Sequence, residues 1–243
     1  ESQLHCFGPS ETTPKQHSPA KTALPQPENH TTTRIEAILK HLENTDGHAF
    51  CLGVNVRTLD GLLRETKFRI VGVDADPTKV DSLRRRYQAA GLYGHRISVH
   101  HHDDPTQFPA PPHFANLVIV DGKPAEDLKP QSLPIVYQAT RPYGGILCIY
   151  SKLGSLNQNT KALTKAVVLE KSPNALIVKK AGALPDTADW SHQYADAGQS
   201  VVSKDNKVKA PLGLLWFGGP SNAKILPRHG HGPSPQVAGG RLF

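Results

Sequence analysis

The chain has 243 residues, of which 37% are apolar and 20% charged, enough for one good-sized domain with extra segments or for two small domains. The net charge of +7 and the pI near 9.3 permit anionic partners, but the cations are scattered apart from one dense run, Arg84 to Arg86. Charge alone therefore favours a basic solvent-exposed surface over nucleic-acid binding. No apolar stretch is long enough to span a bilayer, and the three cysteines show no CxxC spacing.

The N-terminal part differs in composition from the middle of the chain. Residues 1–8 alternate apolar and polar side chains, which predicts a short strand. Residues 9–32 are rich in Pro, Thr, Ser, His and Lys and have almost no large apolar side chain. Such a segment buries too little apolar surface to offset the entropy of ordering it, so we expect a flexible linker.

Residues 33–182 show alternating strand and helix patterns. Apolar residues recur at helical spacing at the start, and helical stretches follow at 58–65 and 77–90. Five apolar runs predict strands, at 49–52, 68–73, 96–100, 115–120 and 145–150. Strands that alternate with helices predict an α/β fold with a doubly wound, mostly parallel sheet covered on both faces.

The end of this zone has a different pattern. Two β-prone runs, 166–170 and 175–180, are joined by only four residues. Such a short connection requires an antiparallel hairpin, so we expect a Rossmann-like sheet that ends in one. From Ala183 onward Gly, Pro and short β-like runs replace the α/β pattern, which predicts a domain boundary near Gly182 and an irregular or β segment over 183–243.

The turn after the first strand is a candidate ligand site. In a doubly wound sheet, ligands bind at the carboxyl ends of the strands, near the point where the strand order reverses. Gly53 suits the tight turn that a nucleotide-type ligand needs there, whereas Asn55 and Arg57 stand where further glycines would be favourable. An ordinary strand-to-helix turn is the alternative interpretation.

The second strand ends at Asp74, about twenty residues beyond Gly53. This is the spacing expected for a carboxylate that accepts hydrogen bonds from a ribose diol. Asp76 lies nearby and could instead cap the helix that begins at Pro77. We favour Asp74 as the ligand-binding residue.

The third strand is followed by Asp103 and Asp104, either of which could accept a hydrogen bond from an adenine amino group. Asp103 is the preferred candidate and Asp104 its close rival. The run His100 to His102 invites a metal interpretation, but adjacent strand residues point to opposite faces and cannot all bind one ion. We expect no metal site.

The fourth strand ends at Asp121 and Gly122, at the edge that would face the reacting end of a ligand. Asp121 could bind or deprotonate an acceptor, or it could merely terminate the strand. We keep it as a weak catalytic candidate. A tight glycine-containing turn, RPYGG, then precedes the fifth strand.

Taken together, FCLG, VGVDADP, HHDDP, ANLVIVD and RPYGGILCIY resemble the class I S-adenosylmethionine-dependent methyltransferase family, in order and spacing over about 150 residues. The resemblance implies S-adenosylmethionine as the cofactor. It also implies that Gly53 holds the methionine end, Asp74 the ribose and Asp103 the adenine, with Asn55 and Asp104 beside them. The chain departs from the family at Asn55, where a second glycine is usual, at Arg57, and in lacking an Asn-Pro-Pro-Tyr type motif after the fourth strand.

The flanks show a second resemblance. Residues 1–8, the segment from ADWSHQY to LLWFGG, and SPQVAGGRLF resemble pieces of a quinoprotein (PQQ-like) β-propeller. Blades need several repeats to close, so we expect a fragment of a larger protein whose remaining propeller is a partner of this domain. Nothing in the fragment supports a PQQ site. The compartment is left open between cytoplasm and export.

Three functional hypotheses follow. The first is an S-adenosylmethionine-binding methyltransferase-like domain whose acceptor the sequence does not reveal. The second is a catalytically degenerate binding or scaffold module of a larger propeller protein, consistent with Asn55, Arg57 and the missing acceptor motif. The third is an NAD-dependent oxidoreductase, since Asp74 would also suit its ribose, although the hairpin and the absence of a full GxGxxG count against it. Fold alone does not decide among them.

Overall fold

The computed structural model describes residues 23–24, 29–151, 160, 163–208, 211, 213 and 235–243. The strand expected over 1–8 and most of the linker expected over 9–32 lie outside the described residues, and residues 29–32 of that linker belong to a helix instead. The first elements are α1 (Asn29–Leu39), β1 (His48–Leu52), α2 (Val56–Glu65), β2 (Arg69–Asp74), α3 (Pro77–Ala89), β3 (Ile97–His101) and the short 3₁₀ helix η1 (Pro105–Gln107). The later ones are β4 (Leu117–Val120), α4 (Lys123–Glu126), α5 (Leu133–Gln138), β5 (Gly145–Ile149), β6 (Ala166–Ser172), β7 (Ala175–Lys180), β8 (Val237–Ala238) and β9 (Arg241–Leu242).

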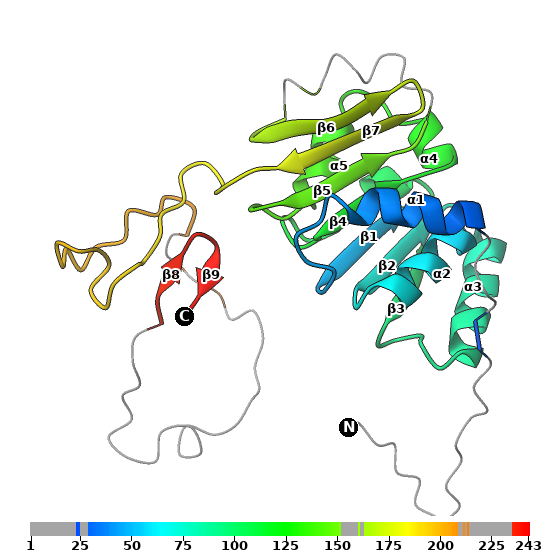
Figure 1. Cartoon of the computed structure of the whole chain (residues 1–243), viewed down its shortest axis with the longest axis horizontal. Coiled ribbons are helices and arrows are strands. Elements are labelled where there is room, and N and C mark those ends of the chain that lie inside the picture. The colour runs from blue at the N-terminus through cyan, green and yellow to red at the C-terminus, as the bar shows by residue number, and fades with distance from the viewer. Residues whose placement is uncertain are drawn as a thin grey trace, which may run out of the picture.

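Seven strands form one twisted sheet in the order β3-β2-β1-β4-β5-β7-β6 (Figure 1). The first five strands are parallel, and β7 runs antiparallel to both β5 and β6. The expected doubly wound sheet and its terminal hairpin are therefore confirmed. The strand order reverses between β1 and β4, so a crevice for a ligand belongs at the carboxyl ends of these two strands.

Helices cover both faces of the sheet and create two apolar cores. Against one face pack α1, α2 and α3, through residues such as Ile38, Leu62 and Tyr87. Against the other pack α4 and α5, through residues such as Ala125 and Val136. Because the central strands are buried on both sides, their sequences are nearly continuous apolar runs rather than alternating ones.

Local sequence signals fix the starts of the helices that line the crevice. Asn55 caps α2 by accepting a hydrogen bond from the backbone N–H of Arg57 at 3.0 Å. Asp76 caps α3 by accepting from the N–H groups of Thr78 and Lys79, and proline occupies the first turn. The alternative role that we considered for Asp76 in the sequence is thus the one that it plays. The first helix, α1, begins at Asn29, a few residues before the expected start at residue 33.

The region after Gly182 has little core of its own. Trp190 pairs with Val237 in an isolated antiparallel bridge, and β8 and β9 form a two-stranded hairpin. Ala195 is the one buried apolar residue that the described part of the chain provides beyond β7. Among the described residues, no helix is both long and apolar enough to cross a bilayer.

Candidate functional site

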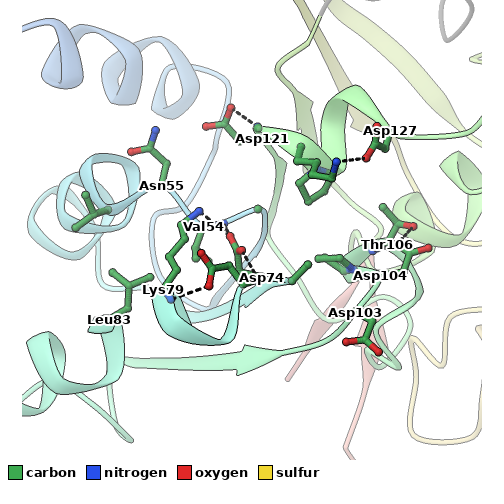
Figure 2. A pocket seen from close by; sticks show the side chains of 18 of the residues that line it. Val54, Asn55, Asp74, Lys79, Leu83, Asp103, Asp104, Thr106, Asp121 and Asp127 are labelled. Carbon is green, nitrogen blue, oxygen red and sulfur yellow. Dashed lines mark hydrogen bonds and ion pairs between the residues drawn. The ribbon is translucent and has the colours of Figure 1, made fainter. Parts of the chain in front are cut away.

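A pocket of about 1190 Å³ lies at the carboxyl edge of the sheet, where the strand order reverses (Figure 2). Its walls come from the segments that follow four parallel strands. Every residue that the sequence analysis assigned to ligand binding or catalysis lines it: Gly53, Asn55, Asp74, Asp103, Asp104 and Asp121. The sheet therefore brings together side chains that are up to 68 residues apart in the sequence.

Gly53 makes the turn out of β1 in a conformation that favours glycine. Its φ is +75°, in the left-handed region. A Cβ atom at this position would collide with the carbonyl oxygen of Asp121 and would lie 2.9 Å from Cδ of Pro124. The backbone after β1 and the backbone after β4 therefore approach each other closely because residue 53 has no side chain.

Asp74 is the most deeply buried carboxylate of the pocket, with 10% of its side chain exposed. Its Oδ2 accepts hydrogen bonds from the backbone N–H of Val54 at 2.9 Å and from Nζ of Lys79 at 2.8 Å. Its Oδ1 accepts from the backbone N–H of Asp76 at 3.0 Å. Asp74 therefore links the turn after β1 to the turn after β2 and presents its carboxylate to the pocket (Figure 2).

Asn55 stands where a second glycine would be favourable, and its backbone conformation does not require glycine. Its φ of −106° is ordinary extended backbone, which any residue can adopt. Its side-chain oxygen is used to cap α2, so a ligand would meet an exposed amide that is already engaged with the helix. At this position the first turn therefore presents a side chain to the pocket, where a glycine would present bare backbone.

Asp103 and Asp104 differ in how far they are engaged. Asp103 has 97% of its side chain exposed, and its carboxylate lies 3.6 Å from Nε2 of His101. Asp104 caps η1, where its Oδ1 accepts from the backbone N–H of Thr106 at 3.0 Å and from its hydroxyl at 2.7 Å. Asp103 is thus the acid with more freedom to reach a ligand.

Asp121 is held by an ion pair that the sequence did not reveal. Nη2 of Arg34, on α1, lies 2.8 Å from its Oδ2, and its Oδ1 accepts from the backbone N–H of Gly122 at 2.9 Å. The guanidinium of Arg34 also stacks over the ring of Tyr150 at 3.9 Å. Both carboxylate oxygens of Asp121 are therefore engaged within the protein.

Two residues that pair with carboxylates of the pocket were missed from the sequence. Lys79, in the first turn of α3, lies only five positions after Asp74, and this spacing could have suggested the contact. Arg34 is 87 positions away from its partner Asp121, and no local pattern connects them. The second contact depends on how α1 packs beside the end of β4.

The three consecutive histidines have separate partners. Their ring nitrogens contact the hydroxyl of Ser98, the carbonyl oxygen of Ala75 and the carbonyl oxygen of Asp104, respectively. Within the described part of the chain, no group of three His, Cys, Asp or Glu side chains is placed to hold a metal ion.

No protein-family model and no curated protein matches this sequence. Solved structures do match. A candidate S-adenosylmethionine-dependent methyltransferase from Methanococcus maripaludis is 14% identical and superposes with a TM-score of 0.51, over 63% of this chain and 86% of that chain. A sarcosine dimethylglycine methyltransferase candidate from Galdieria sulphuraria is 12% identical, with a TM-score of 0.48 over 63% and 84% of the two chains.

A third match, a methyltransferase from Thiobacillus denitrificans in complex with S-adenosylhomocysteine, is 17% identical, with a TM-score of 0.41 over 56% and 55% of the two chains. The second and third matches have TM-scores below 0.5 and add nothing to the fold assignment. The first match, together with the strand order and the reversed β7, defines the class of this domain: a Rossmann-like methyltransferase fold.

Proposed function

We propose that the pocket binds S-adenosylmethionine and that the domain is methyltransferase-like, with an acceptor still to be identified. The observation that carries the proposal is the Asp74 carboxylate, buried at the end of β2 and held by the N–H groups of Val54 and Asp76. A carboxylate fixed in this way is ready to accept hydrogen bonds from a ribose diol. Among the described residues its Oδ1 has one hydrogen-bond donor, so a lone pair is open to a ligand.

The other residues extend this site in two directions. Asp103 follows β3 and, on the resemblance to class I methyltransferases, would accept from the adenine amino group, with Asp104 beside it. Gly53 and the exposed amide of Asn55 would lie at the methionine end, where the two backbone turns meet. The bound cofactor would supply a methyl group on a positively charged sulfonium.

The protein would contribute positioning more than acid–base chemistry. Asp121 is neutralised by Arg34, so it is better suited to hold α1 against the end of β4 than to remove a proton. Methyl transfer depends mainly on placing an acceptor in line with the sulfonium, and that needs no base. The pocket volume of about 1190 Å³ exceeds what one drug-sized ligand occupies, which leaves room for a small acceptor.

Calorimetric titration of the whole chain with S-adenosylmethionine, S-adenosylhomocysteine and NAD tests this proposal. We expect micromolar binding of the first two, weakened at least tenfold in Asp74→Asn because a ribose hydroxyl loses a charged acceptor. Asp81→Asn removes an exposed carboxylate of α3 outside the pocket and is the matched control. Circular dichroism would verify that each variant is folded. Preferential binding of NAD would favour an oxidoreductase instead.

A second candidate function is a binding or scaffold module, and one observation favours it. Exposed large apolar side chains occur in the segment after β7, at Tyr194, Val201, Val202, Val208, Leu242 and Phe243. Such side chains would be covered if a further β structure packed against this segment. The remainder of a β-propeller would be such a partner. A chain that binds none of the three cofactors would support this alternative.

A further inference from the structure

Lys79 occupies the face of Asp74 that a ribose would need. Its Nζ lies 2.8 Å from Oδ2 of Asp74, and the side chain extends from the first turn of α3 across the pocket wall (Figure 2). With 44% of its side chain exposed, Lys79 is free to move into solvent. Asp74 has 10% of its side chain exposed and is fixed by two backbone N–H groups. Of the two side chains, that of Lys79 is the one that can move when a ligand binds.

The lone pairs of Asp74 can be counted. Each carboxylate oxygen accepts about two hydrogen bonds. Oδ2 accepts from the N–H of Val54 and from Nζ of Lys79, so it is full, while Oδ1 accepts from the N–H of Asp76 and has one position left among the described residues. A ribose diol donates two hydrogen bonds. In the free protein Asp74 can accept one of them, and the second requires the position that Lys79 holds.

We propose that Lys79 competes with the ribose diol for Asp74 and is displaced from Oδ2 when the ligand binds. The inference rests on the proposed function, because it assumes that a ribose-containing ligand enters this pocket. In the free protein, the ammonium neutralises a carboxylate that would otherwise be buried without a cation. Lys79 thereby lowers the affinity of the site for a ribose ligand. The size of this effect depends on the two hydroxyl groups with which the ligand binds Asp74.

The competition predicts an unusual gain of affinity on removal of a pocket residue. Breaking a half-exposed ion pair costs up to about 1 kcal/mol, so Lys79→Met should bind S-adenosylhomocysteine about two- to fivefold more tightly than the wild type. The matched control is Arg85→Met, which removes an exposed positive charge from the same helix and does not line the pocket. Its affinity should equal that of the wild type.

Two further measurements separate competition from a general electrostatic effect. Adenosine should gain affinity in Lys79→Met, whereas 2′,3′-dideoxyadenosine should not, because a ligand without hydroxyl groups does not need the lone pairs of Asp74. Rising ionic strength weakens the pair between Lys79 and Asp74. The advantage of Lys79→Met over the wild type should therefore shrink as salt is added.

The test is titration of the whole chain, as wild type, Lys79→Met and Arg85→Met, with S-adenosylhomocysteine by calorimetry and with the two nucleosides by NMR. Tighter binding confined to Lys79→Met and to ligands with the diol supports the inference. Unchanged or weaker binding by a folded Lys79→Met, while the wild type binds, overturns the competition and leaves the proposed function standing. An equal gain for dideoxyadenosine also overturns it. If no variant binds any of the three ligands, the proposed function fails and the competition fails with it.

Discussion

At the scale of single residues, the pocket depends on a few backbone positions that accept little substitution. Gly53 combines a φ of +75° with a close approach to the backbone after β4. Gly182, at the end of the sheet, has a φ of +64° and nothing within 4 Å of a Cβ atom built there. Alanine substitutions at Gly53 and Gly182 therefore separate two contributions to the loss of stability, the strained backbone conformation and the steric collision.

We predict that Gly53→Ala lowers the free energy of unfolding by about 3 kcal/mol or more, because strain and steric overlap add. Gly182→Ala has the strain alone and should cost about 1 kcal/mol. Urea unfolding followed by circular dichroism measures both. Equal losses in the two variants would show that the turn after β1 can relax without the contact with Asp121.

The position of a residue at the pocket could be predicted where it depends on the end of a single strand. Gly53 and Asp74 were predicted because each directly follows an apolar run, and the carboxyl ends of parallel strands meet at one edge. Lys79 and Arg34 were missed because their roles depend on how side chains from a helix reach across that edge. The ion pair between Asp121 and Arg34 became apparent only from the structure.

At the scale of elements, a buried lysine links the last strand of the hairpin to a helix end. Lys180, on β7, is 3% exposed, and its Nζ donates to the carbonyl oxygens of Tyr137 at 2.9 Å and Thr140 at 2.6 Å. These carbonyls lie at the C-terminal end of α5 and just beyond it, where cations are favourable. Burial nevertheless lowers the pKa of Lys180 to about 8, from an ordinary value of 10.5.

This lowered pKa predicts a rise of stability with pH. Between about pH 8 and 10.5 the unfolded chain holds the proton on Lys180 while the folded chain has lost it, so Lys180 contributes an increase in the free energy of unfolding over this window. Burial raises the pKa of the Cys51 and Cys148 thiols to about 12, which contributes in the opposite direction, so the effect of Lys180 is the difference in pH dependence between the wild type and Lys180→Met. The increase attributable to Lys180 should reach about 1–3 kcal/mol. Guanidinium unfolding at pH 7.5 and pH 9.5 measures it.

Two variants isolate the effect of Lys180 from that of the other titrating groups. The free energy of unfolding of Lys180→Met should increase less, or fall more, between pH 7.5 and 9.5 than that of the wild type, since the group that supplies the increase is gone. Lys179→Met removes the neighbouring lysine, whose Nζ pairs with Glu43 at 2.8 Å on the surface, and should keep the pH dependence of the wild type. The same pH dependence in Lys180→Met and the wild type would contradict this assignment.

The order and type of the main elements could be predicted because strand and helix periods alternate clearly from residue 33 onward. The antiparallel hairpin followed from a connection too short for a crossover, and β6 and β7 pair in that way. The first residue of α1 could not be predicted from the sequence. Its first residues are polar, and the sequence contains no apolar period there to indicate where the helix begins.

At the scale of the whole molecule, the apolar core is confined to one part of the chain. Apart from Ala195, the buried apolar residues of the described chain lie between Ile35 and Val178. The boundary near Gly182, predicted from the change of composition, stays a prediction. The β-propeller resemblance of the flanks stays a prediction, because a propeller requires repeats that this chain does not contain.

We predict that a chain ending at Gly182 keeps the fold of the α/β domain. Little apolar surface is buried beyond that point, so the midpoint of thermal unfolding should change by no more than about 5 °C. Differential scanning calorimetry of the short and full chains measures this. A short chain that fails to unfold cooperatively would show that the segment after β7 is part of the same folding unit.

The central claim is that the pocket at the carboxyl edge binds an S-adenosyl ligand through Asp74. A crystal structure of the whole chain grown with S-adenosylhomocysteine tests it most directly. We predict ribose hydroxyls within hydrogen-bonding distance of the Asp74 carboxylate, and adenine beside Asp103. Well-ordered ligand density elsewhere on the molecule, with Asp74 still joined to Lys79 in an empty pocket, would contradict the account.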